Sequence, residues 1–245
     1  MKVIGVIPAR WASVRFPGKV LADLNGKPLI RHVWEQARKA EALDAVLIAC
    51  DDQRVADVCR AFGATVKMTS VDHASGTDRT AEAVKDVDAD IVVNIQGDEP
   101  MVDPETISGL VSVLKDTTDC PMATVVKRVE DPREMVDPNI VKVVVDQKGQ
   151  ALYFSRYAIP FYRDGMPDDP GLGYKHLGLY AYRKDFLMGF CDLPESRLEK
   201  TEKLEQLRAL EAGCKIKTIV TESESVGVDT PEDLARAAKM VNSKL

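Results

Sequence analysis

Short apolar runs alternate with longer amphipathic runs along most of the chain, and this alternation limits the possible folds more than any other feature. The early apolar runs, such as residues 3–7 and 91–95, are rich in β-branched side chains and carry no charge. A strand that is apolar on both faces has to be covered by helices on both sides. Strands of this kind separated by helical segments are typical of an α/β fold with a doubly wound, mostly parallel sheet.

The pattern gives expected bounds for each element. The predicted strands are residues 3–7, 45–50, 65–68, 91–95, 122–126, 141–145, 151–154, 177–182 and 216–220. The predicted helices are residues 28–40, 54–62, 77–84, 104–114 and 231–241, three of which begin at a proline, a residue tolerated at helix starts. Residues 141–182 contain several strands and little helix. We interpret them as a small β-rich subdomain within a single domain that spans residues 1–245.

Composition and charge exclude several classes of protein. The chain has 245 residues, 45% of them hydrophobic, and a formal net charge of -6. General nucleic-acid binding normally needs a broad basic surface, so the charge predicts no nucleic-acid partner. No segment approaches the ~20 apolar residues that span a bilayer. The apolar run at residues 3–7 meets Pro8 and Arg10 without a small-residue cleavage site, which predicts a buried strand and no membrane insertion.

The five cysteines are scattered and contain no CxxC pair. This arrangement predicts neither a disulfide framework nor a structural zinc site, and it favours a reducing, cytoplasmic location. The three histidines show no HxxH spacing, which argues against a zinc hydrolase.

The segment after the first predicted strand concentrates positive charge in an acidic protein. Between residues 10 and 27 there are four cationic side chains and one acid, Asp23. A cationic loop at the end of a strand can hold phosphates and stabilise a leaving pyrophosphate. A solvated surface loop is the alternative, and charge count alone favours it. The chain has neither a GxGxxG fingerprint after a strand nor a GxxxxGK[ST] loop, so a dinucleotide oxidoreductase and a P-loop NTPase are not supported.

Two aspartates follow apolar segments and are candidate magnesium ligands. Asp98 comes after Gly97 at the end of a predicted central strand, where a hard oxygen ligand suits Mg²⁺ shared with phosphate oxygens. A turn or capping role ahead of Pro100 is equally compatible with this position. Asp229 lies two residues before Pro231, where an aspartate or threonine also makes a good helix N-cap.

At these positions the chain resembles a known family. Ile7-Pro8-Ala9-Arg10, Ser13, Arg15-Phe16-Pro17-Gly18-Lys19 and Gly26-Lys27-Pro28 look like the signature of cytidylyltransferases that act on 3-deoxy-manno-octulosonate (KDO). Sialic acid cytidylyltransferases share the Pro-Ala-Arg start but usually continue with Lys-Asn, where this chain has Gly18-Lys19. Sugar-1-phosphate nucleotidyltransferases carry a glycine-rich loop instead. The resemblance extends from Val3 to Leu234.

The resemblance implies a fold, a reaction and a quaternary structure. The fold would be that of the nucleotide-diphospho-sugar transferases, which is glycosyltransferase-A-like. The reaction would join CTP and KDO into CMP-KDO and pyrophosphate, activating KDO for lipopolysaccharide biosynthesis. Mg²⁺ would be held by Asp98 and Asp229, which with Arg10 and Lys19 would form the catalytic set. The enzyme would be a homodimer, with residues 141–182 as the expected interface.

The resemblance also implies two sets of binding residues. The nucleotide-binding positions are Pro8, Ala9, Arg10, Ser13, Arg15, Lys19, Ser75, Gly76, Arg79, Gln96 and Asp98. The sugar-binding positions are Gln96, which would lie between the two substrates, Arg156, His176, Tyr180, Glu205 and Gln206.

The residues alone leave simpler explanations open. Ser75 can be an ordinary helix cap, His176 and Tyr180 can be packing residues on a half-buried strand, and Glu205 and Gln206 can lie on a solvated helix face. Three functional alternatives also remain. They are the 8-amino analogue of KDO or sialic acid as the acceptor, a nucleotide-sugar sensor without catalysis, and an NAD-dependent oxidoreductase that lacks the fingerprint.

Overall fold

The computed structural model describes residues 1–12, 16–165, 173–224 and 226–243. The predicted site residues Ser13 and Arg15 lie outside these ranges. The chain divides into two compact units, the first made of Met1–Ser108 and Glu224–Leu245 and the second of Gly109–Ser223. Each unit has its own strands and helices and is described separately below.

The first unit is built on four parallel strands in the order β6 (Ile91–Asn94), β1 (Val3–Ala9), β4 (Ala45–Cys50) and β5 (Thr65–Met68). The register pairs Gly5 of β1 with Val46 on one side and Val93 on the other. The side chains of β1 and β6 are almost entirely buried, as expected for strands that are apolar on both faces. The predicted α/β class and parallel, doubly wound arrangement are therefore confirmed here.

Three helices follow the strands of this sheet, and local capping sets where they start. Pro28 precedes α1 (Leu29–Ala37), and the Asp52 side chain accepts a hydrogen bond from the N–H of Arg54 at the start of α2 (Gln53–Ala61). A capping box formed by Ser75 and Asp78 starts α3 (Gly76–Val84). The three predicted helices are confirmed. The first of them ends at Ala37, three residues before the expected end.

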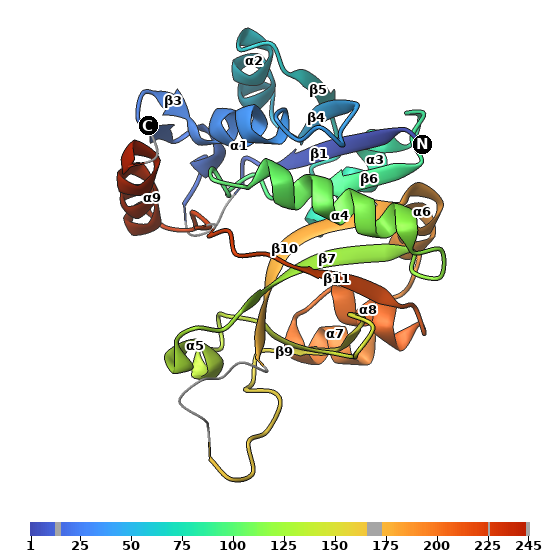
Figure 1. Cartoon of the computed structure of the whole chain (residues 1–245). Helices are drawn as coiled ribbons and strands as arrows, with labels where there is room; N and C mark the ends of the chain where they lie inside the picture. The colour runs from blue at the N-terminus through green and yellow to red at the C-terminus, as the bar shows by residue number, and fades with distance from the viewer. Residues whose placement is uncertain (13–15, 166–172, 225, 244–245) are drawn as a thin grey trace. The chain divides into compact units, whose positions relative to one another are not determined.

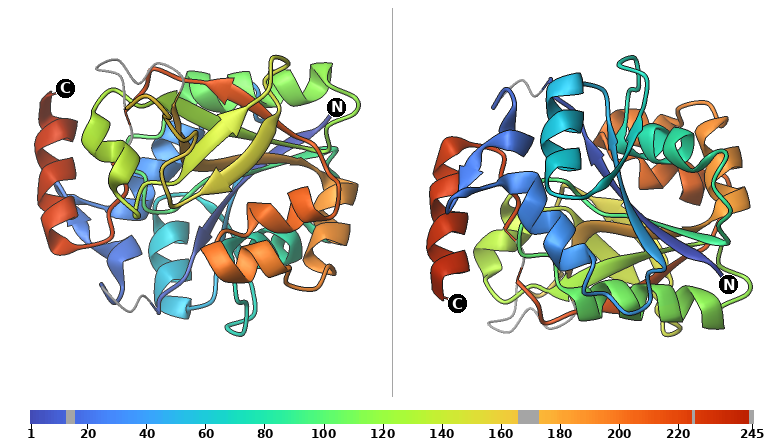
Figure 2. Two further views of the ribbon diagram at one scale, coloured as in Figure 1. Left: turned by 90° about the horizontal axis from the view of Figure 1, so that it is seen from below. Right: turned by 90° about the horizontal axis from the view of Figure 1, so that it is seen from above.

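The C-terminal helix returns to the first unit and covers a hairpin that sequence reasoning missed. The hairpin consists of β2 (Asp23–Leu24) and β3 (Lys27–Pro28), and it follows the short 3₁₀ helix η1 (Lys19–Leu21). Its Asn-Gly turn has positive φ at both residues, as tight hairpins require. Helix α9 (Pro231–Ser243) lies beside this hairpin in both figures (Figures 1 and 2). A buried cluster of Leu24, Leu29, Val228 and Ala237 joins the two.

The second unit mixes parallel and antiparallel pairing. Its strands are β7 (Met122–Arg128), β8 (Lys142–Val145), β9 (Ala151–Ser155), β10 (Tyr174–Arg183) and β11 (Ile216–Val220). Strand β7 lies between β11, which is parallel to it, and β10, which is antiparallel. Strands β10, β8 and β9 then pair in that order, antiparallel throughout. This unit thus contains the β-rich segment expected at residues 141–182.

The helices of the second unit are mostly short: α5 (Pro132–Val136), α6 (Lys184–Cys191), α7 (Arg197–Glu202) and α8 (Gln206–Glu211). Helix α4 (Pro104–Asp116) is longer, and it begins at Pro104 as predicted. The boundary between the two units falls within this helix, between residues 108 and 109. Among the residues that the structure describes, no helix is both long enough and apolar enough to cross a membrane.

Candidate active site

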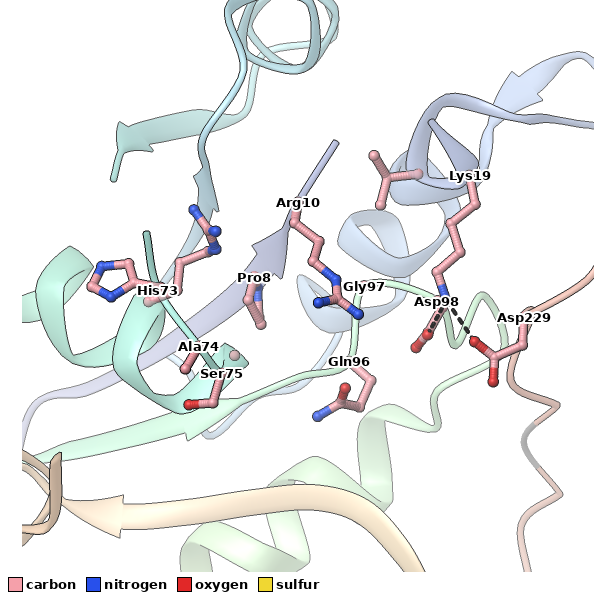
Figure 3. Close-up of a pocket in the computed structure, with 13 residues that line it drawn as sticks. Pro8, Arg10, Lys19, His73, Ala74, Ser75, Gln96, Gly97, Asp98 and Asp229 are labelled. Atoms are coloured by element: carbon pink, nitrogen blue, oxygen red, sulfur yellow. Dashed lines mark hydrogen bonds and ion pairs between the residues drawn. The ribbon is translucent and has the colours of Figure 1, made fainter. Parts of the chain in front are cut away.

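A cavity of about 260 Å³ lies in the first unit, where β1 and β6 end. Figure 3 shows side chains from both strand ends, from the start of α3 and from the segment before α9 converging on it. Nine predicted site residues line this cavity: Pro8, Arg10, Lys19, Ser75, Gly76, Arg79, Gln96, Asp98 and Asp229. This location agrees with the general rule that parallel sheets bind ligands beyond the carboxyl ends of their strands.

One wall of the cavity contains a cation, the ammonium group of Lys19, that is held by three oxygens. The Nζ atom of Lys19 donates hydrogen bonds to Oδ2 of Asp98 at 2.6 Å, to Oδ1 of Asp229 at 2.9 Å and to the carbonyl oxygen of Val228 at 3.0 Å (Figure 3). The Lys19 side chain is only 12% exposed. Burial alone lowers the pKa of this ammonium group, but the charges and hydrogen bonds of Asp98 and Asp229 outweigh burial and raise the pKa. Lys19 is therefore positively charged.

Backbone packing sets the position of Asp98. The preceding residue, Gly97, lies so close to β1 that a Cβ atom added to it would be 2.7 Å from the carbonyl oxygen of Pro8. Glycine is the residue that allows this approach of two backbones. The carbonyl oxygen of Asp98 in turn accepts a hydrogen bond from the N–H of Val228 at 2.9 Å. The two carboxylates are thus brought together by backbone contacts as well as by Lys19.

Asp229 does not cap the helix that follows it. The hydroxyl of Thr230 accepts a hydrogen bond from the N–H of Asp233, and the Asp233 carboxylate accepts one from the N–H of Thr230. This reciprocal pair is the capping box of α9. The capping alternative for Asp229 is therefore wrong, and the Asp229 carboxylate faces Lys19 instead.

The donor set suits a magnesium ion. Two carboxylates from distant segments already converge on one positive charge, and oxygen ligands are those that Mg²⁺ prefers. The described residues contain no group of three or more histidine, cysteine or acidic side chains placed to hold a metal. An ion at this position would therefore take its remaining ligands from water and phosphate, as Mg²⁺ commonly does in nucleotide sites.

The opposite wall is the start of α3. The hydroxyl of Ser75 accepts a hydrogen bond from the N–H of Asp78, so the capping role considered for Ser75 is correct, and Ser75 also lines the cavity. Arg79 lines the cavity too, but its guanidinium is already engaged. It donates to Oδ2 of Asp51 at 2.8 Å and to the hydroxyl of Thr69 at 2.6 Å.

The other predicted nucleotide residues differ in exposure. Arg10 is exposed and points into the cavity beside Gln96 (Figure 3). Ala9 is completely buried and does not line the cavity.

Sequence reasoning assigned no role to four residues that line the cavity: Val20, His73, Ala74 and Gly97. His73 hydrogen-bonds through Nε2 to the carboxylate of Glu82. Its position two residues before Ser75, close to a predicted ligand-binding turn, was the available signal. Asp51, the partner of Arg79, was also missed, although it directly follows a predicted strand.

The predicted sugar-binding residues other than Gln96 belong to the second unit. His176 of β10 shares a hydrogen bond with the hydroxyl of Thr124 at 2.9 Å, and its ring contacts the rings of Phe154 and Tyr180. Burial lowers the pKa of His176 to about 3. Burial raises the pKa of Tyr180 well above its usual value, and the charge of Glu205 adds to the effect. Both side chains are thus uncharged hydrogen-bonding groups at neutral pH.

Gln206 stands out among the buried side chains of this unit. It is 4% exposed, and its Nε2 atom has no hydrogen-bond partner within the part of the chain that the structure describes. A buried amide nitrogen without a partner is costly, so this atom is a candidate for bonding a ligand. A solvated helix face is therefore the wrong description of Gln206, whereas Glu205 beside it is half-buried.

The guanidinium group of Arg156 is bonded to backbone carbonyls. Its Nε atom donates to the carbonyl oxygen of Glu202 at 2.9 Å and its Nη1 atom to that of Pro138 at 3.0 Å. Arg156 thus braces the end of α7, just before Glu205 and Gln206.

Comparison with known proteins places these observations in a family context. A family model described as cytidylyltransferase matches residues 4–219. A 3-deoxy-manno-octulosonate cytidylyltransferase from Solibacter usitatus is 52% identical over 100% of this chain and 96% of its own length. One of the same name from Geobacter sulfurreducens is 48% identical over 96% of this chain and 98% of its own length.

Solved structures agree with the sequence comparisons. A structure of CMP:2-keto-3-deoxy-manno-octonic acid synthetase complexed with CTP has a TM-score of 0.95 and 42% identity, and all of both chains is covered. The 4-diphosphocytidyl-2C-methyl-D-erythritol synthase of Anaerococcus prevotii has a TM-score of 0.65 at 12% identity, with 98% of this chain and 99% of the other covered. The second likeness concerns the fold alone.

Proposed function

The chain belongs to the cytidylyltransferase family, and on that premise we propose how its residues carry out the transfer of CMP from CTP to KDO. The products are CMP-KDO, the activated sugar used in lipopolysaccharide biosynthesis, and pyrophosphate. The observation that carries this function is identity of about one half, over essentially the whole chain, with 3-deoxy-manno-octulosonate cytidylyltransferases. The intact cationic cavity with its two converging carboxylates supports a catalytic protein over a sensor.

CTP binds in the cavity of the first unit in this proposal. Arg10 and Lys19 neutralise the phosphates, and the start of α3 at Gly76, next to the Ser75 cap, places the positive end of a nine-residue helix at the cavity. Gln96 lies between the two substrates. Residues Ser13 and Arg15, which lie between Arg10 and Lys19 in the sequence, would add to the phosphate site.

Asp98 and Asp229 would hold Mg²⁺ together with phosphate oxygens. When bound, the ion supplies Lewis-acid polarisation of the α-phosphate and lowers the pKa of the anomeric 2-hydroxyl of KDO. Lys19, which lies between both carboxylates, stabilises the negative charge that develops on the pyrophosphate. The anomeric 2-hydroxyl oxygen of KDO attacks the α-phosphorus of CTP in line with the departing pyrophosphate. No covalent enzyme intermediate is therefore needed.

KDO is held by the second unit in this proposal. Its many hydroxyls need neutral donors and acceptors, which the uncharged His176 and Tyr180 and the amide nitrogen of Gln206, unpartnered among the described residues, provide. Glu205 accepts from a further hydroxyl. Arg156 supplies positive charge for the KDO carboxylate and braces the segment that carries Glu205 and Gln206.

The direct test of the function is pyrophosphate release by the purified protein with CTP and Mg²⁺. KDO, its 8-amino analogue and sialic acid should be compared side by side. Turnover that is highest with KDO is expected. A preference for the 8-amino analogue would retain the chemistry and change the acceptor, whereas no release with any of the three would contradict the function.

The ring of His176 is expected to stay neutral across the working pH range, because burial lowers its pKa to about 3 from an ordinary value of 6.5. Between these values the unfolded chain binds a proton that the native state does not. The stability gained by burying the neutral ring is thus fully present above pH 6.5 and is lost progressively as pH falls toward 3.

Nuclear magnetic resonance of the imidazole protons checks this prediction between pH 5 and 8, with the His176 signal assigned by its absence in His176→Gln. A midpoint near 6.5 for that signal would contradict it. In steady-state kinetics, His176→Gln should raise the KM for KDO about tenfold and leave the KM for CTP unchanged, because one lost hydrogen bond to a substrate costs roughly 1 kcal/mol or more.

We further propose a homodimer formed by the β-rich segment of the second unit. Among the named strands, β9 pairs with β8 alone, and the large side chains of Leu152, Tyr157 and Phe161 on or after β9 are strongly exposed. An exposed apolar edge of this kind favours association with another copy. Light scattering coupled to size-exclusion chromatography should give twice the chain mass, and Leu152→Glu should shift it to one chain mass. A monomeric wild type would contradict the dimer.

A cytoplasmic location is proposed from the cysteines. All five lie in the described residues, and all are free thiols. Unpaired cysteines are typical of a reducing compartment. Fractionation of cells that express the tagged protein tests this, and recovery with the periplasmic fraction would contradict it.

A further inference from the structure

Asp51 lies close to the cavity of the first unit with its side chain mostly buried, and both of its carboxylate oxygens accept hydrogen bonds. It directly follows β4, and its side chain is 9% exposed. Its Oδ1 atom accepts a hydrogen bond from the backbone N–H of Trp11 at 3.0 Å, and its Oδ2 atom accepts one from Nη2 of Arg79 at 2.8 Å. Asp51 does not line the cavity itself. Any effect that it has on the nucleotide must therefore act through its partners.

The first partner, Trp11, connects the two segments that carry Arg10 and Lys19. It directly follows Arg10, and its carbonyl oxygen accepts a hydrogen bond from the N–H of Gly18 at 3.1 Å, next to Lys19. A Cβ atom on Gly18 would lie 2.9 Å from the Trp11 ring, so the backbone there is packed directly on the indole. The guanidinium of Arg54 covers the ring at 3.8 Å. The hydrogen bond from Trp11 to Asp51 thus holds the segments that carry both Arg10 and Lys19.

The second partner, Arg79, belongs to the opposite wall. It lies in α3, lines the cavity and is 4% exposed at its side chain. Its Nη1 atom donates to the hydroxyl of Thr69 and to the carbonyl oxygen of Ser70 at 3.2 Å, at the start of the loop that leads to Ser75. A buried arginine of this kind needs a paired anion, because removing one partner of a buried ion pair leaves an uncompensated charge.

We propose that Asp51 is a positioning residue for the nucleoside triphosphate. Its two oxygens bond Trp11, which follows Arg10, and Arg79 of α3, and so set the spacing between the cations Arg10 and Lys19 and the start of α3 at Ser75. This inference rests on the proposed binding of CTP in this cavity. Small displacements of charged groups weaken phosphate binding strongly, so the spacing determines affinity for the triphosphate.

The matched control is Asp44. It also accepts a backbone N–H hydrogen bond from the β1 segment, from Val3 to Oδ2 at 2.7 Å, but at the opposite end of the strand. Asp44→Asn therefore perturbs the same kind of bond between the same strands without touching the cavity. Its expected effect is on stability alone.

The experiment measures the dissociation constant of CTP by calorimetry together with KM and kcat for both substrates. Asp51→Asn keeps an oxygen for the N–H of Trp11 but removes the charge that faces Arg79, and it should raise both Kd and KM for CTP at least tenfold. The KM for KDO should remain within about twofold, because the second-unit residues are not involved.

Asp51→Glu keeps the charge but displaces it, and it should give an intermediate CTP affinity. Asp44→Asn should bind CTP as the wild type does.

The outcomes separate this inference from the proposed function. Wild-type protein that does not bind CTP contradicts the proposed function itself. Wild-type protein that binds CTP, with Asp51→Asn folded by circular dichroism and binding CTP equally well, overturns the role of Asp51. If Asp51→Asn does not fold, Asp51→Glu decides the question, since unchanged CTP affinity in that variant overturns the proposal. Equal losses of affinity in Asp51→Asn and Asp44→Asn also overturn it, because they indicate a general structural effect.

Discussion

Asp98→Asn is expected to lower the turnover number for pyrophosphate release by roughly 100- to 1,000-fold, while the protein remains folded. The proposed magnesium ion would lose one of two carboxylate ligands, and a neutral amide oxygen is a much weaker ligand for a hard cation. Asparagine has nearly the same shape as aspartate and still accepts a hydrogen bond from Lys19. Lys19 also keeps its bonds to Asp229 and to the carbonyl oxygen of Val228. The free energy of unfolding should therefore change by only about 1 kcal/mol.

The turnover number is measured from pyrophosphate release at saturating CTP and KDO, and thermal unfolding checks that the variant is folded. The matched control is Asp57→Asn on α2, where the side chain is exposed and lies outside the cavity. That variant should retain wild-type turnover. Normal turnover in Asp98→Asn would remove Asp98 from the proposed metal site. Binding of Mn²⁺ followed by electron paramagnetic resonance should also weaken in Asp98→Asn and not in the control.

Gly97→Ala is expected to lower kcat/KM for CTP by roughly 100-fold and to destabilise the fold by about 1–3 kcal/mol. The added Cβ atom would lie 2.7 Å from the carbonyl oxygen of Pro8, and 3.4 Å and 3.5 Å from side-chain carbons of Ile30 and Ile7. A backbone oxygen cannot rotate away as a flexible side chain can. Either the end of β1 or the turn after β6 has to move, and both carry cavity residues.

Gly189→Ala is the matched control for this substitution. Gly189 lies in α6, and a Cβ atom there would meet no atom within 4 Å. Alanine is also the better helix former, so this variant should be neutral or slightly more stable. Chemical denaturation and steady-state kinetics on both variants provide the comparison. Wild-type kinetics in Gly97→Ala would mean that the close approach of the two backbones has no part in shaping the cavity.

The bounds of several strands were readable from the sequence. Residues 45–50, 65–68 and 216–220 were predicted with the bounds that β4, β5 and β11 have. Residues 45–50 carry no charge, and such an apolar run has few stable places other than a buried strand. Residues 65–68 and 216–220 each contain one lysine, but their β-branched residues still favour a strand. The start of α3 was similarly readable, because Ser75 and Asp78 form a local capping box.

Features that depend on tertiary contacts were harder to predict from the sequence. Strand β10 begins at Tyr174, three residues before the expected start, because Tyr174 and Lys175 pair with β7 and β8. The local pattern before Pro231 fitted both Asp229 and Thr230 as the cap. In the structure Thr230 forms the capping box with Asp233, and Asp229 is bonded to Lys19 instead. The ion pair between Asp51 and Arg79 joins residues 28 positions apart, and no local spacing indicates it.

Three charged groups of the cavity wall, Lys19, Asp98 and Asp229, come from distant parts of the sequence. Lys19 is 79 residues from Asp98 and 210 residues from Asp229. Ribosomes add about 5–20 residues per second, so Asp229 is made roughly 10 to 40 s after Lys19. Until then a nascent chain has Lys19 and at most one of the two carboxylates, that of Asp98, and it lacks the segment that carries Val228 and Asp229. The capacity to bind a metal–nucleotide complex through both carboxylates is therefore acquired only after Asp229 has been synthesised.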